Sequence, residues 1–225
     1  RRRMLERIFF HDVLNTVSSI RMISQLMETV EENSELMGEL KQTLARLSKQ
    51  AGEEITAQQQ LLSAEQGDLQ VVPSDTLVAD LLRELQAISC TGDPQLLERI
   101  TLIAPPECRL VTDPVILRRV LGNLVKNALE ATPNGEAIAV VAEQRDGKIA
   151  FHVSNPGVIP DEIQRQIFHR SFSTKGGRGR GIGTYSVKLL TERYLGGHVT
   201  FVSQEPAGTT FTVTLPIGST PTVAS

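Results

Sequence analysis

Aromatic residues are scarce in this sequence: they make up 4% of its 225 residues, and tryptophan is absent. Proteins that hold nucleic acid bases by stacking depend on aromatic side chains, so a stacking surface of that kind is not expected. The formal net charge is only −3. Without an excess of basic residues, the sequence does not favour nucleic acid or an anionic membrane as a partner.

Cysteine and long apolar runs are also lacking. Cys90 and Cys108 are the only two cysteines, and without metal-ligand spacing they indicate a reducing, cytoplasmic setting. No apolar run approaches the roughly 18 residues that a membrane-spanning helix needs, and no secretory signal is recognisable. The chain opens with three arginines already inside a helical pattern, which predicts a further segment upstream.

Proline is absent from residues 1–66, where Gly38 and Gly52 are the only glycines. Apolar residues recur there at three- and four-residue steps on both sides of a polar stretch at 31–34, which predicts two long helices in an antiparallel hairpin. Such a hairpin cannot bury both of its apolar stripes alone. We therefore expect an all-α hairpin at 1–66 that forms a four-helix bundle as a homodimer.

The pattern changes at Gly67 to shorter elements. It predicts a short strand at 69–72, a helix from an N-cap at Ser74 or Asp75 to about residue 87, strand-like segments at 99–104 and 109–111, and a helix from Asp113 to Ala131. Later residues predict a hairpin of strands 137–142 and 149–153, helices at 160–168 and 182–194, and a closing strand pair at 199–203 and 209–215. Residues 67–216 thus predict an α+β sandwich domain, followed by a disordered tail at 217–225.

The first candidate site is the segment Phe-Phe-His-Asp-Val-Leu-Asn-Thr at 9–16. His11 falls opposite the apolar stripe of its helix and is expected to be exposed. An imidazole with an unprotonated ring nitrogen is a good nucleophile, Asp12 can accept a proton or hold the tautomer, and Asn15, one turn further on, can orient a water. The alternative is a solvated His-Asp pair on a surface helix.

The second candidate site is spread over three stretches. Asn123 and Asn127 share one face of the helix predicted at 113–131, and amide oxygens suit Mg²⁺, which keeps waters and phosphate oxygens as its other ligands. Asn155 and Gly157 lie in a turn after the strand at 149–153.

The third stretch is rich in glycine and basic residues, and glycines let a backbone come close to phosphates. A solvated flexible loop is the alternative. Its candidate nucleotide-binding residues are Lys175, Gly179, Arg180, Gly181, Gly183 and Thr184.

These stretches resemble, in order, the H-box, N-box, G1 box and F-box with G2 box of sensor histidine kinases, members of the GHKL ATPase superfamily. The resemblance covers nearly the whole chain. It implies an ATP-binding domain after the hairpin, autophosphorylation of His11 by ATP with Mg²⁺ on Asn127, and phosphotransfer to an aspartate of a response-regulator receiver domain. It also implies an upstream sensor domain and allows a membrane anchor in the full-length protein.

Three departures from the family pattern leave alternatives open. Asn155 stands where the family has an aspartate that binds the adenine amino group, the G1 segment is one residue short, and Glu130 stands where the kinases often have lysine. Asn123 occupies the position of the water-activating glutamate of the ATP-hydrolysing relatives, which fits a kinase. The alternatives are a pseudokinase or phosphatase-biased signalling scaffold, and a GHKL-type ATPase or serine kinase that does not use His11.

Overall fold

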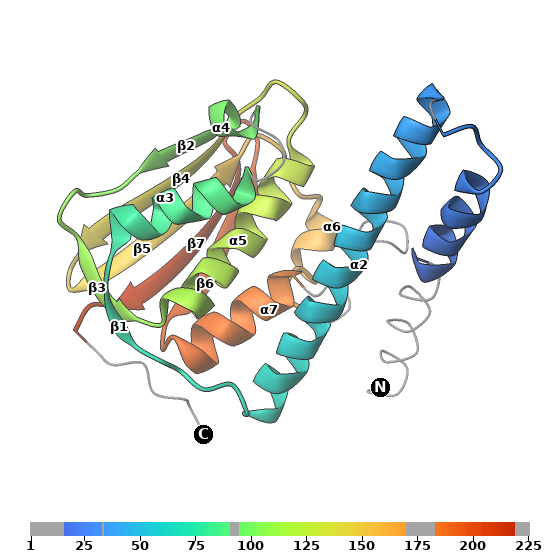
Figure 1. The fold of residues 1–225 in the computed structure, drawn as a ribbon. Helices are drawn as coiled ribbons and strands as arrows, with labels where there is room; N and C mark the ends of the chain where they lie inside the picture. The colour runs from blue at the N-terminus through green and yellow to red at the C-terminus, as the bar shows by residue number, and fades with distance from the viewer. Residues whose placement is uncertain (1–15, 33, 91–94, 170–182, 219–225) are drawn as a thin grey trace. The chain divides into compact units, whose positions relative to one another are not determined.

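A computed structural model describes residues 16–32, 34–90, 95–169 and 183–218 (Figure 1). Backbone contacts divide the chain into two units, and the helical unit gives way to the larger one between Gln66 and Gly67. Several predicted site residues lie outside the described residues, as does the tail from 219 on: His11, Asp12, Asn15, Lys175, Gly179, Arg180 and Gly181.

The first unit contains a helix at 16–27 and the long helix α2 (Glu35–Gln66), joined by a turn. Ser34 begins α2 as an N-cap, because its hydroxyl accepts a hydrogen bond from the amide of Met37 at 3.2 Å. Gly67 follows the end of α2 with a φ of +85°, a left-handed conformation that favours glycine after a helix. Within the described residues, helix is present on both sides of the predicted connection.

The second unit is built on a five-stranded sheet in the order β2-β4-β5-β7-β6 (Figure 1). β2 runs parallel to β4, and the other neighbours are antiparallel. The strands are β2 (Ile100–Ile103), β4 (Ile138–Arg145), β5 (Lys148–Asn155), β6 (His198–Gln204) and β7 (Gly208–Pro216). A separate pair is formed by β1 (Ser74–Leu77) and β3 (Arg109–Thr112).

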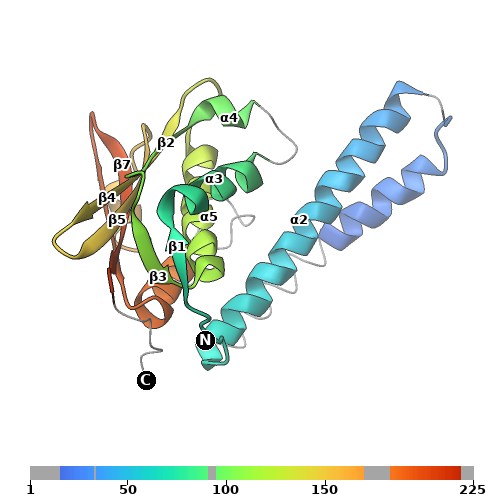
Figure 2. The ribbon, with the colours of Figure 1, turned by 60° about the vertical axis from the view of Figure 1, so that its left-hand side comes forward.

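Helices cover one face of this sheet (Figure 2). The long ones are α3 (Val78–Ser89) and α5 (Pro114–Ala131), and α7 (Gly183–Leu189) continues into the π-helical turn η1 (Leu190–Tyr194). The short helices α4 (Leu96–Arg99) and α6 (Asp161–Gln164) lie in the connections. The expected layered α+β domain is present, as a mixed sheet with helices on one side.

The core lies between the helices and the covered face of the sheet. Every second residue of β5 is buried, as strand geometry requires when one face is packed. Leu117, Val120, Leu121 and Leu124 of α5 are at most 1% exposed and pack on the covered side. The opposite face carries polar pairs, such as Ser154 with Thr210 at 2.9 Å.

Local geometry confirms the predicted beginning of α5 and the predicted turn between β4 and β5. Asp113 caps α5, because its side chain accepts from the amides of Val115 and Ile116, and Pro114 occupies the first turn. The β4–β5 hairpin turns at Asp146 and Gly147, whose φ values are 51° and 71°, as a tight hairpin turn requires.

The region before α3 was wrongly predicted. Residues 68–73 form no strand, and Ser74 and Asp75 belong to β1 rather than capping a helix, so α3 begins only at Val78. The reason is a non-local one: β1 pairs along its length with β3, and this ladder outweighs the capping tendency of serine and aspartate.

Both later helices are shorter or less regular than predicted. α6 ends at Gln164, and tighter turns follow to residue 169, in which amides bond to the third residue before them. The helix predicted at 182–194 changes to a π-helical turn at Leu190, where the amide of Leu195 bonds to the carbonyl of Leu190 at 3.0 Å.

Candidate nucleotide-binding site

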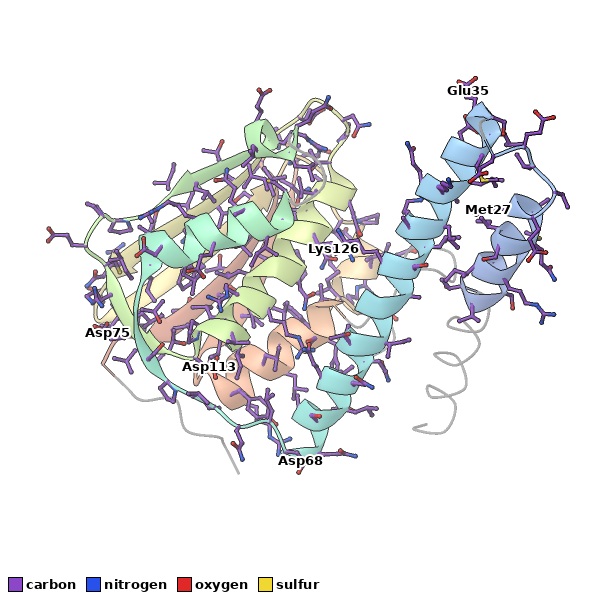
Figure 3. All side chains as sticks on the ribbon, in the orientation of Figure 1. Met27, Glu35, Asp68, Asp75, Asp113 and Lys126 are labelled. Atoms are coloured by element: carbon purple, nitrogen blue, oxygen red, sulfur yellow. The ribbon has the colours of Figure 1, made fainter. Side chains whose placement is uncertain are left out.

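The two asparagines of α5 lie one turn apart at the border of the core. Both are half-buried, while Leu124 and Val125 between them are buried. The helix therefore packs its apolar face on the sheet and keeps two side-chain amides at the edge of that packing. Figure 3 labels Lys126 on α5, the exposed residue that directly precedes Asn127 in the chain.

Asn127 lies against the start of α7. A Cβ atom on Gly183 would stand 3.5 Å from Nδ2 and 3.7 Å from Oδ1 of Asn127. The structure thus brings together two predicted site residues that are far apart in the sequence. A side chain at position 183 would therefore be in van der Waals contact with the Asn127 amide group.

Thr184 has its hydroxyl engaged within the protein. This hydroxyl donates to the carbonyl of Ile167, which links the first turn of α7 to the segment after α6. The neighbouring Phe168 packs edge-on against Phe201 at 5.8 Å between ring centroids, and the Lys188 ammonium lies 5.6 Å from the Phe168 ring. Residues on both sides of 170–182 are therefore anchored to the domain.

Asn155 ends β5 and is only 8% exposed. Its Nδ2 donates to the carbonyl of Gly157 at 3.4 Å, a long hydrogen bond. The same carbonyl accepts a shorter bond from the Thr209 hydroxyl at 2.7 Å. Thr209 in turn lies 2.7 Å from the Ser203 hydroxyl, which accepts from the amide of Ile159 at 2.7 Å.

The turn at 156–159 also packs on the end of α5. A Cβ atom on Gly157 would come within 3.1 Å of the Ala131 carbonyl. Gly208, with a φ of +79°, leaves no room for a Cβ, which would lie 2.2 Å from the Asn155 carbonyl. Close backbone packing at these two glycines fixes the turn next to the helix that carries Asn123 and Asn127.

Several residues of this neighbourhood are not among the predicted site residues. Thr209, Ser203 and Gly208 hold the turn in place, and the sequence signal for Gly208 and Thr209 is the Gly-Thr-Thr run that opens β7. Arg119 lies one turn before Asn123 on the same helix face. Burial lowers the pKa of Arg119 from its ordinary value, but a guanidinium stays protonated at neutral pH, so this face carries a cation.

Within 16–32, 34–90, 95–169 and 183–218, no group of three or more His, Cys, Asp or Glu side chains could hold a metal ion. A cation here would therefore depend on amide oxygens and on oxygens that a ligand supplies. No helix in the part of the chain that the structure describes is long and apolar enough to cross a membrane.

The comparisons with known proteins agree with this geometry. Residues 112–219 match the family of histidine kinase-, DNA gyrase B- and HSP90-like ATPases. The sensor histidine kinase CusS of Escherichia coli K12 is 36% identical over 117 residues, which are 49% of this chain and 24% of CusS. The histidine protein kinase DivJ of Caulobacter vibrioides is 32% identical over 173 residues, 73% of this chain and 28% of DivJ.

A solved structure extends the likeness beyond the ATPase domain. The histidine kinase ThkA, crystallised in complex with the response regulator protein TrrA, matches with a TM-score of 0.68 and 22% identity, over 96% of this chain and 61% of ThkA. The chain spans about a quarter of the length of the two sensor kinases named above. With its ATPase domain, its sensor kinase relatives and this shared fold, the chain is the catalytic core of a histidine kinase.

Proposed function

We propose that this chain binds ATP beside Asn127, Asn155 and Gly183 and transfers the γ-phosphoryl group to His11. The observation that carries the proposal is the meeting of the asparagine helix α5 with Gly183 on one side and the Gly157 turn on the other. Both contacts lie within the segment that matches the ATPase family.

Asn155 and its turn are proposed to hold the adenine. The amide of Asn155 is nearly buried at the end of β5, and its oxygen and nitrogen can accept from and donate to a base edge. The phosphates are assigned to the region of Gly183, with Gly179, Gly181, Lys175 and Arg180 as further contacts. Arg119 adds positive charge on the asparagine face.

Mg²⁺ is proposed to bind Asn127. The half-buried amide beside Gly183 fits a cation whose other ligands are phosphate oxygens and waters. When bound, the ion would neutralise charge on the phosphates. Asn123 carries no carboxylate that could activate water, which favours transfer to an imidazole over hydrolysis.

In the proposed reaction, a ring nitrogen of His11 forms a bond to the γ-phosphorus. The bond from that phosphorus to the bridging oxygen breaks, and ADP leaves with the electron pair. Asp12 takes the imidazole proton or holds the productive tautomer. Asn15 is assigned to water positioning during later dephosphorylation.

A response-regulator receiver domain is the proposed acceptor of the phosphoryl group. The likeness to ThkA, whose structure was solved with the response regulator TrrA, supports this partner. The sensor kinase relatives support a sensor domain elsewhere in the full-length protein, and they are compatible with a membrane anchor there.

Autophosphorylation with γ-labelled ATP tests the proposal. We expect acid-labile label in the wild-type chain and none in His11→Ala. The dissociation constant for ATP should stay within about twofold, because His11 belongs to the helical unit and Asn127, Asn155 and Gly183 belong to the larger one. Acid-stable label would indicate a serine kinase instead, and ATP binding without any label would indicate a pseudokinase. Label retained in His11→Ala would remove His11 from the mechanism.

A further inference from the structure

Asp113 uses both oxygens of its carboxylate, and each oxygen serves a different segment. Oδ1 accepts from the amides of Val115 and Ile116 at 2.9 and 3.0 Å and so caps α5. Oδ2 accepts from the amide of Val72 at 2.8 Å. Asp113 is only 4% exposed whereas Val72 is 69% exposed, so the bond joins a buried carboxylate to a residue at the surface and is partly buried.

Val72 belongs to the linker, defined here as residues 67–73, which runs from α2 to β1. The linker starts at Gly67, where an added Cβ atom would lie 3.3 Å from Nη2 of Arg193 in η1. Residues 68–73 have no regular secondary structure, and the strand pairing that follows begins at Ser74, opposite Thr112. Figure 3 labels Asp68 in the linker and Asp113 at the start of α5.

We propose that Asp113 is a positioning residue that clamps the linker to α5, the helix that carries Asn123 and Asn127. The clamp sets how much free chain separates the phosphoacceptor unit from the nucleotide. This inference rests on the proposed phosphoryl transfer to His11. It adds that the attachment of the linker to Asp113 limits how His11 can approach the nucleotide.

The length of free chain shows why one hydrogen bond matters. With Val72 held, the free connection after α2 comprises residues 67–71, and without the bond it extends to Pro73. At about 3.3–3.6 Å per residue, two more residues add about 7 Å of reach. Reacting groups must come within about 3–3.5 Å in line, and a misplacement of about 1 Å can cost about a hundredfold in rate.

Two substitutions remove this bond from opposite sides. Asparagine is as good an N-cap as aspartate, so in Asp113→Asn the amide oxygen can keep the two amides of α5. The amide nitrogen then faces the Val72 amide, donor against donor. Val72→Pro removes the donor instead, because proline has no amide hydrogen, and leaves the Asp113 cap in place.

A matched control is available on β1. Asp75 is an exposed aspartate that lies 2.8 Å from Arg109 and has no bond to the linker. Asp75→Asn changes the charge of the same domain by the same amount. It should therefore report any effect of net charge alone.

The experiment measures two quantities on the full chain: the autophosphorylation rate at saturating Mg²⁺-ATP, and the ATP dissociation constant by calorimetry. We expect Asp113→Asn and Val72→Pro each to lower the rate about threefold or more, with ATP affinity held within about twofold. The double variant should be no slower than the slower single variant, because both remove one bond. Amide exchange at residues 68–72 should rise in Asp113→Asn and not in Asp75→Asn.

Two outcomes overturn the role of Asp113. One is a wild-type rate in both variants despite faster amide exchange in the linker. The other is a loss of ATP affinity and thermal stability in proportion to the rate, since the carboxylate would then merely support the fold. A wild-type chain that takes up no label overturns the proposed function itself, and the role of Asp113 with it.

Discussion

At the scale of single residues, Asn155 is the most informative position. A carboxylate there could only accept from the adenine amino group and would repel the O6 acceptor of guanine, whereas an amide can accept and donate. Replacing the amide would also remove its bond to the Gly157 carbonyl, but that bond is long at 3.4 Å, and Thr209 still donates to the same carbonyl. An aspartate at position 155 should therefore gain more free energy of binding from the adenine than it loses in stability of the Gly157 turn.

We predict that Asn155→Asp tightens ATP binding and weakens GTP binding, by about 1–3 kcal/mol in total discrimination. Calorimetric dissociation constants for both nucleotides in both proteins measure this. Thermal unfolding of the variant serves as the control for the turn. If neither constant changes, Asn155 does not face the base and the adenine must bind elsewhere.

The Cys108 thiol gives a pH-dependent prediction at the same scale. Cys108 is a free, buried cysteine, and burial raises the pKa of its thiol above the ordinary value. The folded protein thus holds this proton more tightly than the unfolded chain. The resulting stability is fully present below the ordinary thiol pKa, about 8.5, and is lost as the pH rises above it.

We expect the free energy of unfolding in urea to fall more steeply above about pH 8.5 in the wild type than in Cys108→Ser, which has no thiol to titrate. The comparison is between slopes, because the serine itself changes the absolute stability. Identical slopes in the two proteins would mean that Cys108 does not contribute to the alkaline loss of stability.

At the scale of elements, α4 supports the nucleotide site from a distance. Its last residue, Arg99, donates to the carbonyls of Glu136, Thr132 and Pro133 at 3.0 to 3.1 Å. These carbonyls belong to the connection that follows α5. The end of α5 in turn packs on Gly157. Arg99 therefore stabilises the chain segment next to the turn that is proposed to bind adenine.

Arg99→Gln should therefore raise the ATP dissociation constant about three- to tenfold while leaving the rate at saturating ATP nearly unchanged. A lost hydrogen bond costs about 0.5–1.5 kcal/mol, and of the three bonds the one to the Thr132 carbonyl is partly buried. Arg145→Gln is the matched control, because Arg145 is an exposed arginine in the β4–β5 hairpin, 3.3 Å from Asp146. A fall in the saturated rate with unchanged affinity would contradict this role.

Elements with local signals were the ones that could be predicted. α5 has its capping Asp113, its Pro114 and its apolar periodicity within the helix itself, so the sequence was sufficient. β1 was missed because its pairing partner, β3, lies more than thirty residues away, and no local pattern reports such a partner.

The residues of the candidate site also fall into those that local spacing predicts and those that only long-range contacts bring together. The spacing of Asn123 and Asn127 is local, so their shared helix face could be predicted. The contacts of Gly157 with Ala131 and of Thr209 with the Gly157 carbonyl join distant segments. Only the folded chain brings those residues together, which is why Thr209 and Gly208 were not among the predicted site residues.

At the scale of the whole molecule, the helical unit exposes apolar side chains that a second copy could cover. Its helix at 16–27 exposes Val17, Met22 and Leu26 to 47%, 60% and 48%. We predict that the full chain sediments as a dimer and that Met22→Lys shifts it toward monomer, because a lysine ammonium would have to be buried in the bundle.

Val202→Lys is the control for that experiment, since Val202 is 59% exposed on β6 of the other unit. Analytical ultracentrifugation over a range of concentrations distinguishes the variants. A wild-type chain that remains a folded monomer at all concentrations would rule out the four-helix bundle. An equal effect of both substitutions would place the interface elsewhere.

The π-helical turn η1 has a consequence for the evolution of this domain. Its bond from the Leu195 amide to the Leu190 carbonyl encloses one residue more than an α-helical bond does. Val187 and Tyr194, on either side of its start, are nevertheless fully buried. A one-residue insertion can thus be absorbed within Leu190–Tyr194 without changing the core. Homologous chains that are one residue shorter here can keep the same fold with an uninterrupted α-helix, and an alignment of the family should place a gap at this turn.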